Sequence, residues 1–328
     1  MNQDEVFHIV VNPSGASGHT GKNWEKAEEV FRKSGKPFAV HFSTPEKGIE
    51  EICRELTGDG KKTTLVIVGG DGSLNQAVNG IRDLKNTKVG FIPAGSANDL
   101  ARELGMDMDP CRNAERILRA DTVRLMDVGE VEFLQSCGRI DPISGKEAAP
   151  EEKPFTRRFN SGCGIGFDAA ICREVMVSPL KSVLNKLHLG KLIYIAVAIR
   201  LIFSFRKFDT EMELDGERIL KWPHTLLCVG MEHRYEGGGF MFCPDADDTD
   251  GLLDICVGNP SHTAAFFRIF PSAYKGRHVS FDCVHMEKAG RVHIRTDQPA
   301  WVQTDGEPVC RSSEIRLGTA EDQLRFLF

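Results

Sequence analysis

Three glycine-rich loops combine polar side chains with the backbone freedom that phosphate binding needs. They are Asn12-Pro13-Ser14-Gly15-Ala16, Gly69-Gly70-Asp71-Gly72-Ser73 and Pro93-Ala94-Gly95-Ser96-Ala97-Asn98-Asp99. Glycine lets backbone N–H groups approach phosphate oxygens closely, and a helix that starts at the loop adds partial positive charge. The loops therefore predict a site for a phosphate-bearing ligand. For each loop alone, a tight turn between a strand and a helix remains the alternative.

The elements around these loops indicate that all three lie at one edge of a sheet. The loop at Gly69 follows the continuous apolar run Leu65-Val66-Ile67-Val68, which is typical of a buried parallel strand. Strand and helix patterns alternate through the first third of the chain, which predicts an α/β nucleotide-binding domain with a parallel, Rossmann-like sheet. Parallel sheets bind ligands at the carboxyl ends of their strands, where these loops are expected.

From about residue 125 the pattern changes to short strands separated by turn signals. This predicts a second domain, mainly an antiparallel β-sandwich, at residues 126–308. The first domain is then 1–125, and the tail at about 309–328 is expected to pack back on it. One long helix is predicted near 181–205, and the polar segment 138–153 reads as an exposed insertion loop. The helix carries lysines and arginines among apolar residues. It is either a basic face that docks on anionic lipid or a core helix with solvated charges.

Composition narrows the class of protein. The formal net charge of −6 argues against nucleic acid as a partner. The ten cysteines show no C-x-x-C pair, which is typical of reduced thiols in a cytosolic protein. The polar start Met1-Asn2-Gln3-Asp4-Glu5 does not resemble a signal peptide, and the longest apolar run, 192–199, is too short to cross a bilayer. We therefore expect a cytoplasmic protein, with the oligomeric state open and a homodimer among the possibilities.

The loops, taken with later motifs, resemble the diacylglycerol kinase catalytic-domain family, which includes bacterial soluble lipid kinases, sphingosine kinases and ceramide kinases. The resemblance continues through Phe159-Asn160 and the glycines at 162, 164 and 166, through Pro244-x-Ala246-x-x-x-Asp250-Gly251, and to Asp305-Gly306-Glu307-Pro308. It covers nearly the whole chain in the same order. Ser73 and Ser96 stand where the family more often has threonine, and both keep a hydroxyl group.

The resemblance implies an ATP site, an associated Mg²⁺ ion and a general base. The implied nucleotide contacts are Asn12, Pro13, Ser14, Gly15, Ala16, Thr44, Gly69, Gly70, Asp71, Gly72, Ser73, Leu74, Asn75, Gln76, Ser96, Asn98 and Asp99. Asp71, Asp99 and Glu307 are expected to organise metal and water at the phosphates. Either Asp305 or Glu307 would take the proton of the attacking hydroxyl, and we favour Glu307. Without the resemblance, Asp305-Gly306-Glu307 reads as a hairpin turn.

Two further sites follow from the same resemblance. A structural Mg²⁺ would bind the Asp250 carboxylate and the backbone carbonyls of Asp247 and Leu252, with a solvated acidic turn as the alternative. Asp168 is expected to contact the lipid headgroup, by analogy with sphingosine kinases.

The function predicted is transfer of the γ-phosphoryl group of ATP to a lipid hydroxyl, most simply that of a diacylglycerol at a membrane surface. The alternative enzyme functions are those of a sphingoid or ceramide kinase and of an NAD kinase. The alternative without catalysis is a nucleotide- or lipid-binding protein. The Asn98-Asp99 motif and the late Asp305-Gly306-Glu307 favour a lipid kinase over an NAD kinase.

Overall fold

The computed structural model describes residues 6–15, 19–135, 137–140, 146–150, 154–178 and 190–327. The chain divides into two compact units. The first consists of Met1–Val128 together with Glu321–Phe328, and the second is Gly129–Ala320. The returning tail thus starts at 321, later than the 309 expected from the sequence, because residues up to Thr319 belong to a long strand of the second unit.

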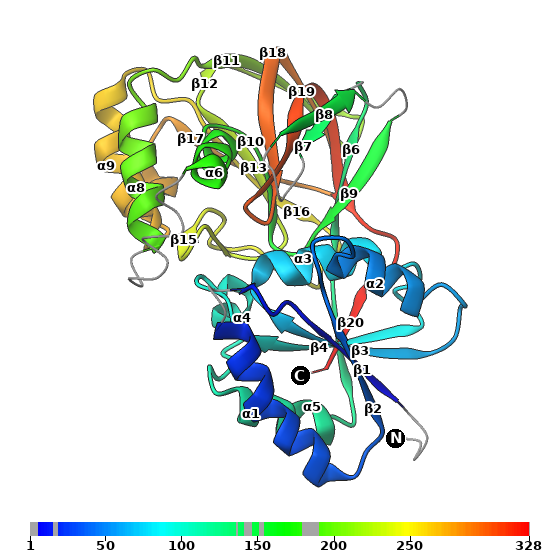
Figure 1. Ribbon diagram of the computed structural model, residues 1–328. Helices are drawn as coiled ribbons and strands as arrows, with labels where there is room; N and C mark the ends of the chain where they lie inside the picture. The colour runs from blue at the N-terminus through cyan, green and yellow to red at the C-terminus, as the bar shows by residue number, and fades with distance from the viewer. Residues whose placement is uncertain are drawn as a thin grey trace. The chain divides into compact units, whose positions relative to one another are not determined.

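The first unit is built on one mostly parallel sheet. Its described strands are β1 (Phe7–Val11), β2 (Phe38–Phe42), β3 (Thr63–Gly69), β4 (Thr87–Pro93), β5 (Val123–Met126) and β20 (Leu324–Leu327). They lie in the order β2-β1-β3-β4-β20-β5 (Figure 1). Only β5 runs antiparallel to its neighbour. Every residue of β3 is buried, as its uninterrupted apolar sequence predicts.

Helices cover both faces of this sheet. They are α1 (His19–Ser34), α2 (Ile49–Leu56), α3 (Asp71–Gly80), α4 (Asp99–Glu103) and α5 (Pro110–Arg119). Helices α1 and α5 pack on one face, where Trp24, Phe31 and Ile117 meet β1 and β3, and α2 and α3 lie on the other (Figure 1). This layered arrangement leaves the carboxyl ends of the parallel strands uncovered by helices, and there the glycine loops emerge.

The second unit is an antiparallel sandwich. Its large described sheet contains β6 (Gly129–Phe133), β9 (Phe155–Phe159), β10 (Gly162–Gly166), β11 (Phe208–Leu214), β12 (Arg218–Thr225), β13 (Leu227–Met231), β16 (Leu253–Gly258), β17 (Val284–Ala289), β18 (Arg291–Thr304) and β19 (Glu307–Thr319). Strand β18 pairs with β11 through its first half and with β10 through its last residues. The pairing of β18 with β19 is irregular between Arg295 and Ala300, where β18 passes from one part of the sheet to the other. Buried apolar residues of these strands form one core.

The remaining described elements of this unit are two short hairpins, three helices and a 3₁₀ turn. They are β7 (Gly138–Ile140) with β8 (Glu147–Pro150), β14 (Tyr235–Glu236) with β15 (Phe240–Met241), α6 (Phe167–Val177), α8 (Gly190–Leu201), α9 (Thr263–Ala273) and η2 (Arg277–Ser280). Apolar residues of α6, α8 and α9 share one cluster (Figure 1). The predicted fold class, an α/β domain followed by an antiparallel β-sandwich, is confirmed.

Two local predictions differ from the structure. The segment 138–153, predicted as an exposed loop, contains the hairpin β7–β8. Burial of Cys137 and Ile140 anchors that hairpin to the unit, and apolar burial outweighs the polar composition around it. The helix predicted over 181–205 ends at Leu201, and residues 181–189 of it lie outside the described residues.

Two other features complete the fold. All ten cysteines lie in the described part of the chain, and each is a free thiol. Within the described ranges, no helix combines the length and the apolar character that crossing a bilayer requires.

Candidate active site

The three predicted loops leave neighbouring parallel strands. Strand β1 pairs with β3 as far as Val11 and Val68, and β3 pairs with β4 as far as Gly69 and Pro93. The pairing continues into the loops, because the N–H of Asn12 donates to Val68 and the N–H of Ala94 donates to Gly69 at 2.7 Å. The loops after β1, β3 and β4 therefore start side by side.

Two of these loops touch through glycines. A Cβ atom added at Gly70 would lie 2.9 Å from the Cα of Gly95, and one added at Gly95 would lie 2.5 Å from the Cα of Gly70. Neither position has room for any larger residue. Helix α3 begins directly after Gly70, so its N-terminus, which carries partial positive charge, lies at the same point. This is the geometry of a phosphate cradle.

Asp71 joins the second loop to the third. Its Oδ2 accepts a hydrogen bond of 3.1 Å from the N–H of Asp99, at the start of α4. Asn98, just before, is in the left-handed conformation with φ of 51°, and its amide bonds both the N–H and the carbonyl of Gly95 at 2.9 Å. The Asp99 carboxylate in turn pairs with Arg102 at 3.0 Å. Asp71, Asn98 and Asp99 thus fix the shape of the loop edge.

The other residues that are predicted to contact the nucleotide differ in position and in exposure. Thr44 follows β2, whose neighbour is β1, and Ser43 donates to the Val11 carbonyl, so Thr44 lies at the same sheet edge. Ser14 and Ser96 are exposed there, whereas Ser73, Leu74 and Asn75 are buried in α3. Ala16 lies outside the described residues. The edge therefore assembles loop residues from four strands, and their nucleotide contacts remain predictions.

In the second unit, Asp305 is held by four hydrogen bonds. Its Oδ2 accepts from the backbone and side-chain nitrogens of Asn160 at 2.8 and 3.1 Å, and its Oδ1 accepts from the N–H groups of Ser161 and Gly162 at 2.7 and 3.1 Å. Asp305 itself is left-handed with φ of 50°, in the turn between β18 and β19. Both of its oxygens are engaged in fixing this turn, which is a structural task. Glu307 follows at the first position of β19 and is partly exposed.

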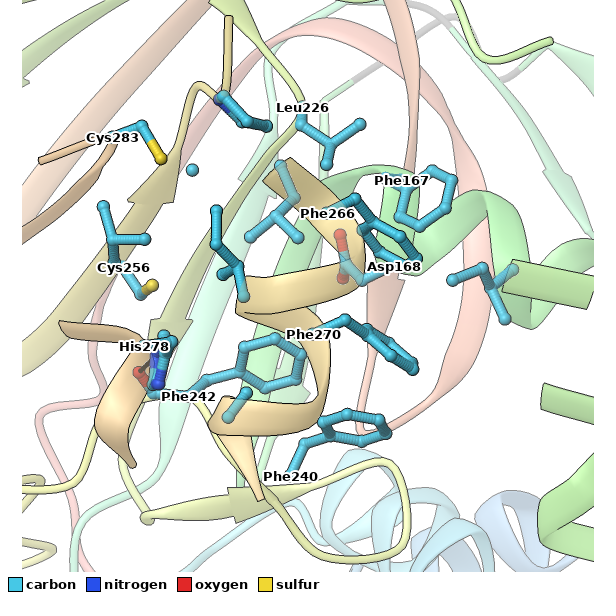
Figure 2. Close-up of a pocket in the computed structure, with 17 residues that line it drawn as sticks. Phe167, Asp168, Leu226, Phe240, Phe242, Cys256, Phe266, Phe270, His278 and Cys283 are labelled. Carbon is cyan, nitrogen blue, oxygen red and sulfur yellow. Dashed lines mark hydrogen bonds between the residues drawn. The ribbon is translucent and has the colours of Figure 1, made fainter. Parts of the chain in front are cut away.

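Asp168 places a carboxylate in an apolar cavity. The cavity has about 80 Å³ of free space and is lined by aromatic rings, among them Phe167, Phe240, Phe266 and Phe270. Figure 2 shows the Asp168 carboxylate among these rings, beside α9. Burial raises the pKa of Asp168 from its ordinary 3.8 to about 6, and hydrogen bonding to Gln303 opposes that shift. Its Oδ1 is buried and has no hydrogen-bond partner among the described residues.

The glycines of β10 make room for this carboxylate. A Cβ added at Gly164 would lie 1.6 Å from Asp168 Oδ2, so no other residue fits at that position. Gly164 is therefore a position of close packing between β10 and the first turn of α6. Because Gly164 has no side chain, Asp168 in the first turn of α6 can place its carboxylate against β10.

Gln303 connects the cavity to the Asp305 turn, and it is a residue that the sequence analysis does not identify. Its Nε2 donates to Asp168 at 3.2 Å and to Glu236 at 2.7 Å, while its Oε1 accepts from the N–H of Gly306 at 2.6 Å. Gln303 is 1% exposed. Nothing in the local pattern marks it, because its role depends on the pairing of β18 with β10, which brings Gln303 opposite Gly164. Only knowledge of that register would have revealed Gln303 and Glu236.

The acidic loop before β16 has a lysine where the predicted metal would lie. Lys288 Nζ is 2.6 Å from Asp250 Oδ2 and 3.0 Å from Asp254 Oδ2, and these carboxylates, Asp250 first, raise the pKa of Lys288. Asp250 Oδ1 accepts from the N–H of Leu252, and Asp247 Oδ1 accepts from Thr249. No group of three or more His, Cys, Asp or Glu side chains able to hold a metal occurs in the described ranges. Lys288 thus pairs with the carboxylate that is the predicted metal ligand, and the metal contacts of Asp247, Asp250 and Leu252 stay a prediction.

The class of protein is defined by two features: an α/β unit with glycine loops at the carboxyl edge of its parallel sheet, and a β-sandwich unit with an apolar cavity between its sheet and helices α6 and α9. Residues 6–131 match the diacylglycerol kinase catalytic domain, and residues 164–316 match the YegS C-terminal NAD kinase beta sandwich-like domain. The two matches lie one after the other along the chain, and the resemblance to the diacylglycerol kinase catalytic-domain family that the sequence motifs predict is confirmed over residues 6–131.

Individual relatives cover most of the chain. Diacylglycerol kinase of Bacillus subtilis (strain 168) is 25% identical over 301 residues, which are 91% of this chain and 88% of that protein. Diacylglycerol kinase of Mycobacterium tuberculosis is 27% identical over 248 residues, 75% of this chain and 71% of that protein. The crystal structure of a diacylglycerol kinase from Bacillus anthracis str. Sterne superposes with a TM-score of 0.67 at 19% identity, covering 99% of this chain and 97% of that one. At that identity the likeness shows the fold.

Proposed function

We propose that this protein is an ATP-dependent lipid kinase that transfers the γ-phosphoryl group to the hydroxyl of a diacylglycerol-type lipid. The observation that carries the proposal is the buried carboxylate of Asp168, whose Oδ1 has no partner among the described residues, within a cavity lined by apolar side chains. A lipid supplies both an apolar body for such a cavity and a polar headgroup for the acid. A buried oxygen without a partner costs about 1–3 kcal/mol, and a hydrogen-bonding group of the bound headgroup would remove that cost. The names of the relatives agree with this substrate class.

In the first unit, the glycine cradle around Gly70 and Gly95 and the N-terminus of α3 would hold the phosphates of ATP. Both features are favourable for negative charge. Bound with ATP, Mg²⁺ supplies charge that offsets the developing charge on the transferred group. The carboxylates of Asp71 and Asp99 offer the hard oxygen donors that this ion prefers, and they would hold it.

In the second unit, we assign the general base to Glu307. The two oxygens of Asp305 already accept four N–H groups, so Asp305 keeps the turn in place. Glu307, two residues further, is partly exposed at the start of β19. A carboxylate that is held by its neighbours at the right position can accept the proton of an attacking hydroxyl. Gln303 connects the turn before Glu307 with Asp168, so the acid in the cavity and the base are positioned by one hydrogen-bonded chain.

The test is a substrate survey. Purified protein is incubated with ATP and Mg²⁺ and, in parallel, with diacylglycerol, ceramide, sphingosine, NAD and a total lipid extract, and the products are identified by mass spectrometry. We expect phosphate on diacylglycerol. Phosphate on sphingosine or ceramide alone would change the lipid class, and phosphate on NAD alone would overturn the proposal. An Asp71→Ala variant with full activity would contradict the assignment of the cradle.

A further inference from the structure

Helix α9 has two aromatic faces with different surroundings. Phe266 and Phe270 line the apolar cavity, and Phe266 is 5% exposed. Phe267, the next residue of the helix after Phe266, is 45% exposed. Tyr274 directly follows the helix and is 38% exposed, and its ring lies 4.0 Å from that of Phe240, another lining residue of the cavity. The helix thus carries aromatic residues that line the cavity and aromatic residues that are exposed.

The end of α8 extends the outer face. Ile199 is 43% exposed, and Phe203, in the turn after α8, is 71% exposed. Phe203 is more exposed than any other large hydrophobic side chain that the structure describes. Its ring lies 6.0 Å from that of Phe267, so the two helices present one continuous surface. We call Ile199, Phe203, Phe267 and Tyr274 the α8–α9 surface; Figure 1 shows α8 and α9 side by side.

The segments that contain the two helices carry charge of one sign, although Glu174 of α6 pairs with Arg200. Segments 190–208 and 259–281, which contain both helices, include lysines and arginines and not one aspartate or glutamate. The chain as a whole has a net charge of −6, so the clustering runs against its composition. Arg206, Arg268 and Lys275 are exposed beside the aromatic residues. Exposed aromatic groups framed by basic side chains suit the interface of an anionic bilayer, where the rings enter the acyl boundary and the cations meet the headgroups.

We propose that the α8–α9 surface docks the protein onto anionic membranes, with Phe203 and Phe267 inserted between the headgroups. The proposal rests on the proposed lipid-kinase function, because a membrane-resident substrate gives such docking its purpose. Since α9 carries both Phe267 of this surface and Phe266 and Phe270 of the cavity wall, docking brings the membrane close to the wall of the lipid site. The partner is the lipid surface itself, and the contacts are independent of ATP.

The experiment measures binding of the full chain to sedimented vesicles without ATP. Vesicles of phosphatidylcholine with phosphatidylglycerol are compared with vesicles of phosphatidylcholine alone. We expect binding to the anionic vesicles only, weakening as salt is added. The double variant Phe203→Ser/Phe267→Ser should bind at least about tenfold more weakly, because it removes the two largest apolar groups of the surface. Arg268→Gln/Lys275→Gln should mainly lose the dependence on salt and on anionic lipid.

A matched control removes exposed apolar groups elsewhere. Phe42 is 51% exposed on β2 and Ile219 is 60% exposed on β12. Phe42→Ser/Ile219→Ser should bind vesicles as the wild type does. All variants should keep the wild-type melting temperature, since the changed side chains are on the surface, and Phe203→Ser/Phe267→Ser should keep its activity on a short-chain, water-soluble diacylglycerol.

Three results would overturn the proposal: wild-type protein that does not bind anionic vesicles, a Phe203→Ser/Phe267→Ser variant that binds as tightly as wild type, or a wild-type dimer that this variant dissociates while vesicle binding persists. The last would make the surface an interface between two copies of the chain. Failure of the proposed function looks different, because vesicle binding would survive while no lipid, soluble or membrane-bound, becomes phosphorylated.

Discussion

Asp305 holds Asn160 at two points, although 145 residues separate them in the chain: one carboxylate oxygen accepts both the backbone and the side-chain nitrogen of Asn160. The other oxygen accepts the next two backbone N–H groups. The turn that follows β9 is therefore built on an acid from the turn between β18 and β19. Both oxygens of Asp305 are used to hold this turn, whereas Glu307 is the proposed base. Mutations of Asp305 and of Glu307 can therefore test the structural and the chemical role of the turn separately.

Replacing Glu307 with glutamine should abolish catalysis with little effect on folding. The change removes the proton acceptor and keeps the shape of the side chain, and loss of a general base lowers kcat by about 10²–10⁴-fold. Steady-state kinetics with a lipid substrate measure kcat, and thermal melting checks the fold. A Glu307→Gln enzyme with wild-type kcat would remove Glu307 from the mechanism.

Replacing Asp305 with asparagine should instead destabilise the protein. Asparagine tolerates the left-handed backbone at this position, but its NH₂ group would face N–H donors that need an acceptor. We expect the free energy of unfolding to fall by about 3–6 kcal/mol, as for the loss of two hydrogen bonds to a charged group. Urea denaturation measures it. Unchanged stability together with lost activity would favour Asp305 as the base.

Replacing Gly70 with alanine should weaken ATP binding. The new Cβ would press on the Cα of Gly95 at 2.9 Å and push the two loops apart. A displacement of this kind in a phosphate cradle should raise the KM for ATP by about ten- to a hundredfold. Gly48→Ala is the matched control, because a Cβ there meets no atom within 4 Å and its φ of −75° suits alanine. An ATP affinity untouched by Gly70→Ala would contradict a phosphate site at these loops.

Asp168 should make stability depend on pH in a direction opposite to that of most acids. Its pKa is raised to about 6 in the folded protein, so between about pH 4 and pH 6 the folded state binds a proton that the unfolded state has released. Stability therefore falls as pH rises through this window. The shift of about two units corresponds to about 3 kcal/mol at pH 7.

The variant Asp168→Asn lacks this titration, so its stability relative to wild type should increase from pH 4 to pH 6.5 and then stay level. Denaturation curves of both proteins across this range measure the difference. A constant difference would show that the carboxyl group has an ordinary pKa. The same variant should raise the KM for the lipid, because it changes the group that the lipid headgroup is proposed to bind.

Lys288 should make the acidic loop independent of divalent ions. Its ammonium group pairs with both Asp250 and Asp254, so addition of EDTA should leave the melting temperature of the wild type unchanged. Lys288→Met leaves two carboxylates facing each other, and it should melt lower by about 3 °C and regain stability with Mg²⁺. The exposed pair of Lys61 with Asp59 gives a control, Lys61→Met, with no expected change. Loss of wild-type stability in EDTA would restore the metal predicted at Asp247, Asp250 and Leu252.

The sequence predicts much of the first unit because its signals are local. An apolar run followed by Gly69-Gly70-Asp71 predicts a buried strand, a turn and a helix, and the parallel order then brings the loops together. The contact of Gly70 with Gly95 follows from that order. The hydrogen bond between the N–H of Asp99 and the Asp71 carboxylate is harder to predict from the sequence, because it depends on the left-handed turn at Asn98.

The second unit is harder to predict because its site is assembled across strands. Gln303 reaches Asp168 only through the register of β18 with β10, and Lys288 reaches Asp254 only because β17 pairs with β16. Such pairings join residues that are distant in sequence, and neither composition nor periodicity specifies them. The hairpin β7–β8 was missed for a similar reason, since Cys137 and Ile140 are buried by the rest of the unit.

Strand β20 has a consequence for how the chain reaches this structure in a cell. It lies between β4 and β5, and Phe326 is fully buried there. During translation the other strands of this sheet leave the ribosome first, and β20 follows only after residues 129–320, a delay of about 10–40 s at ordinary synthesis rates. Throughout that interval β4 presents an unpaired edge, a template for wrong pairing. The nascent first unit is thus a natural client for chaperones until its last strand arrives.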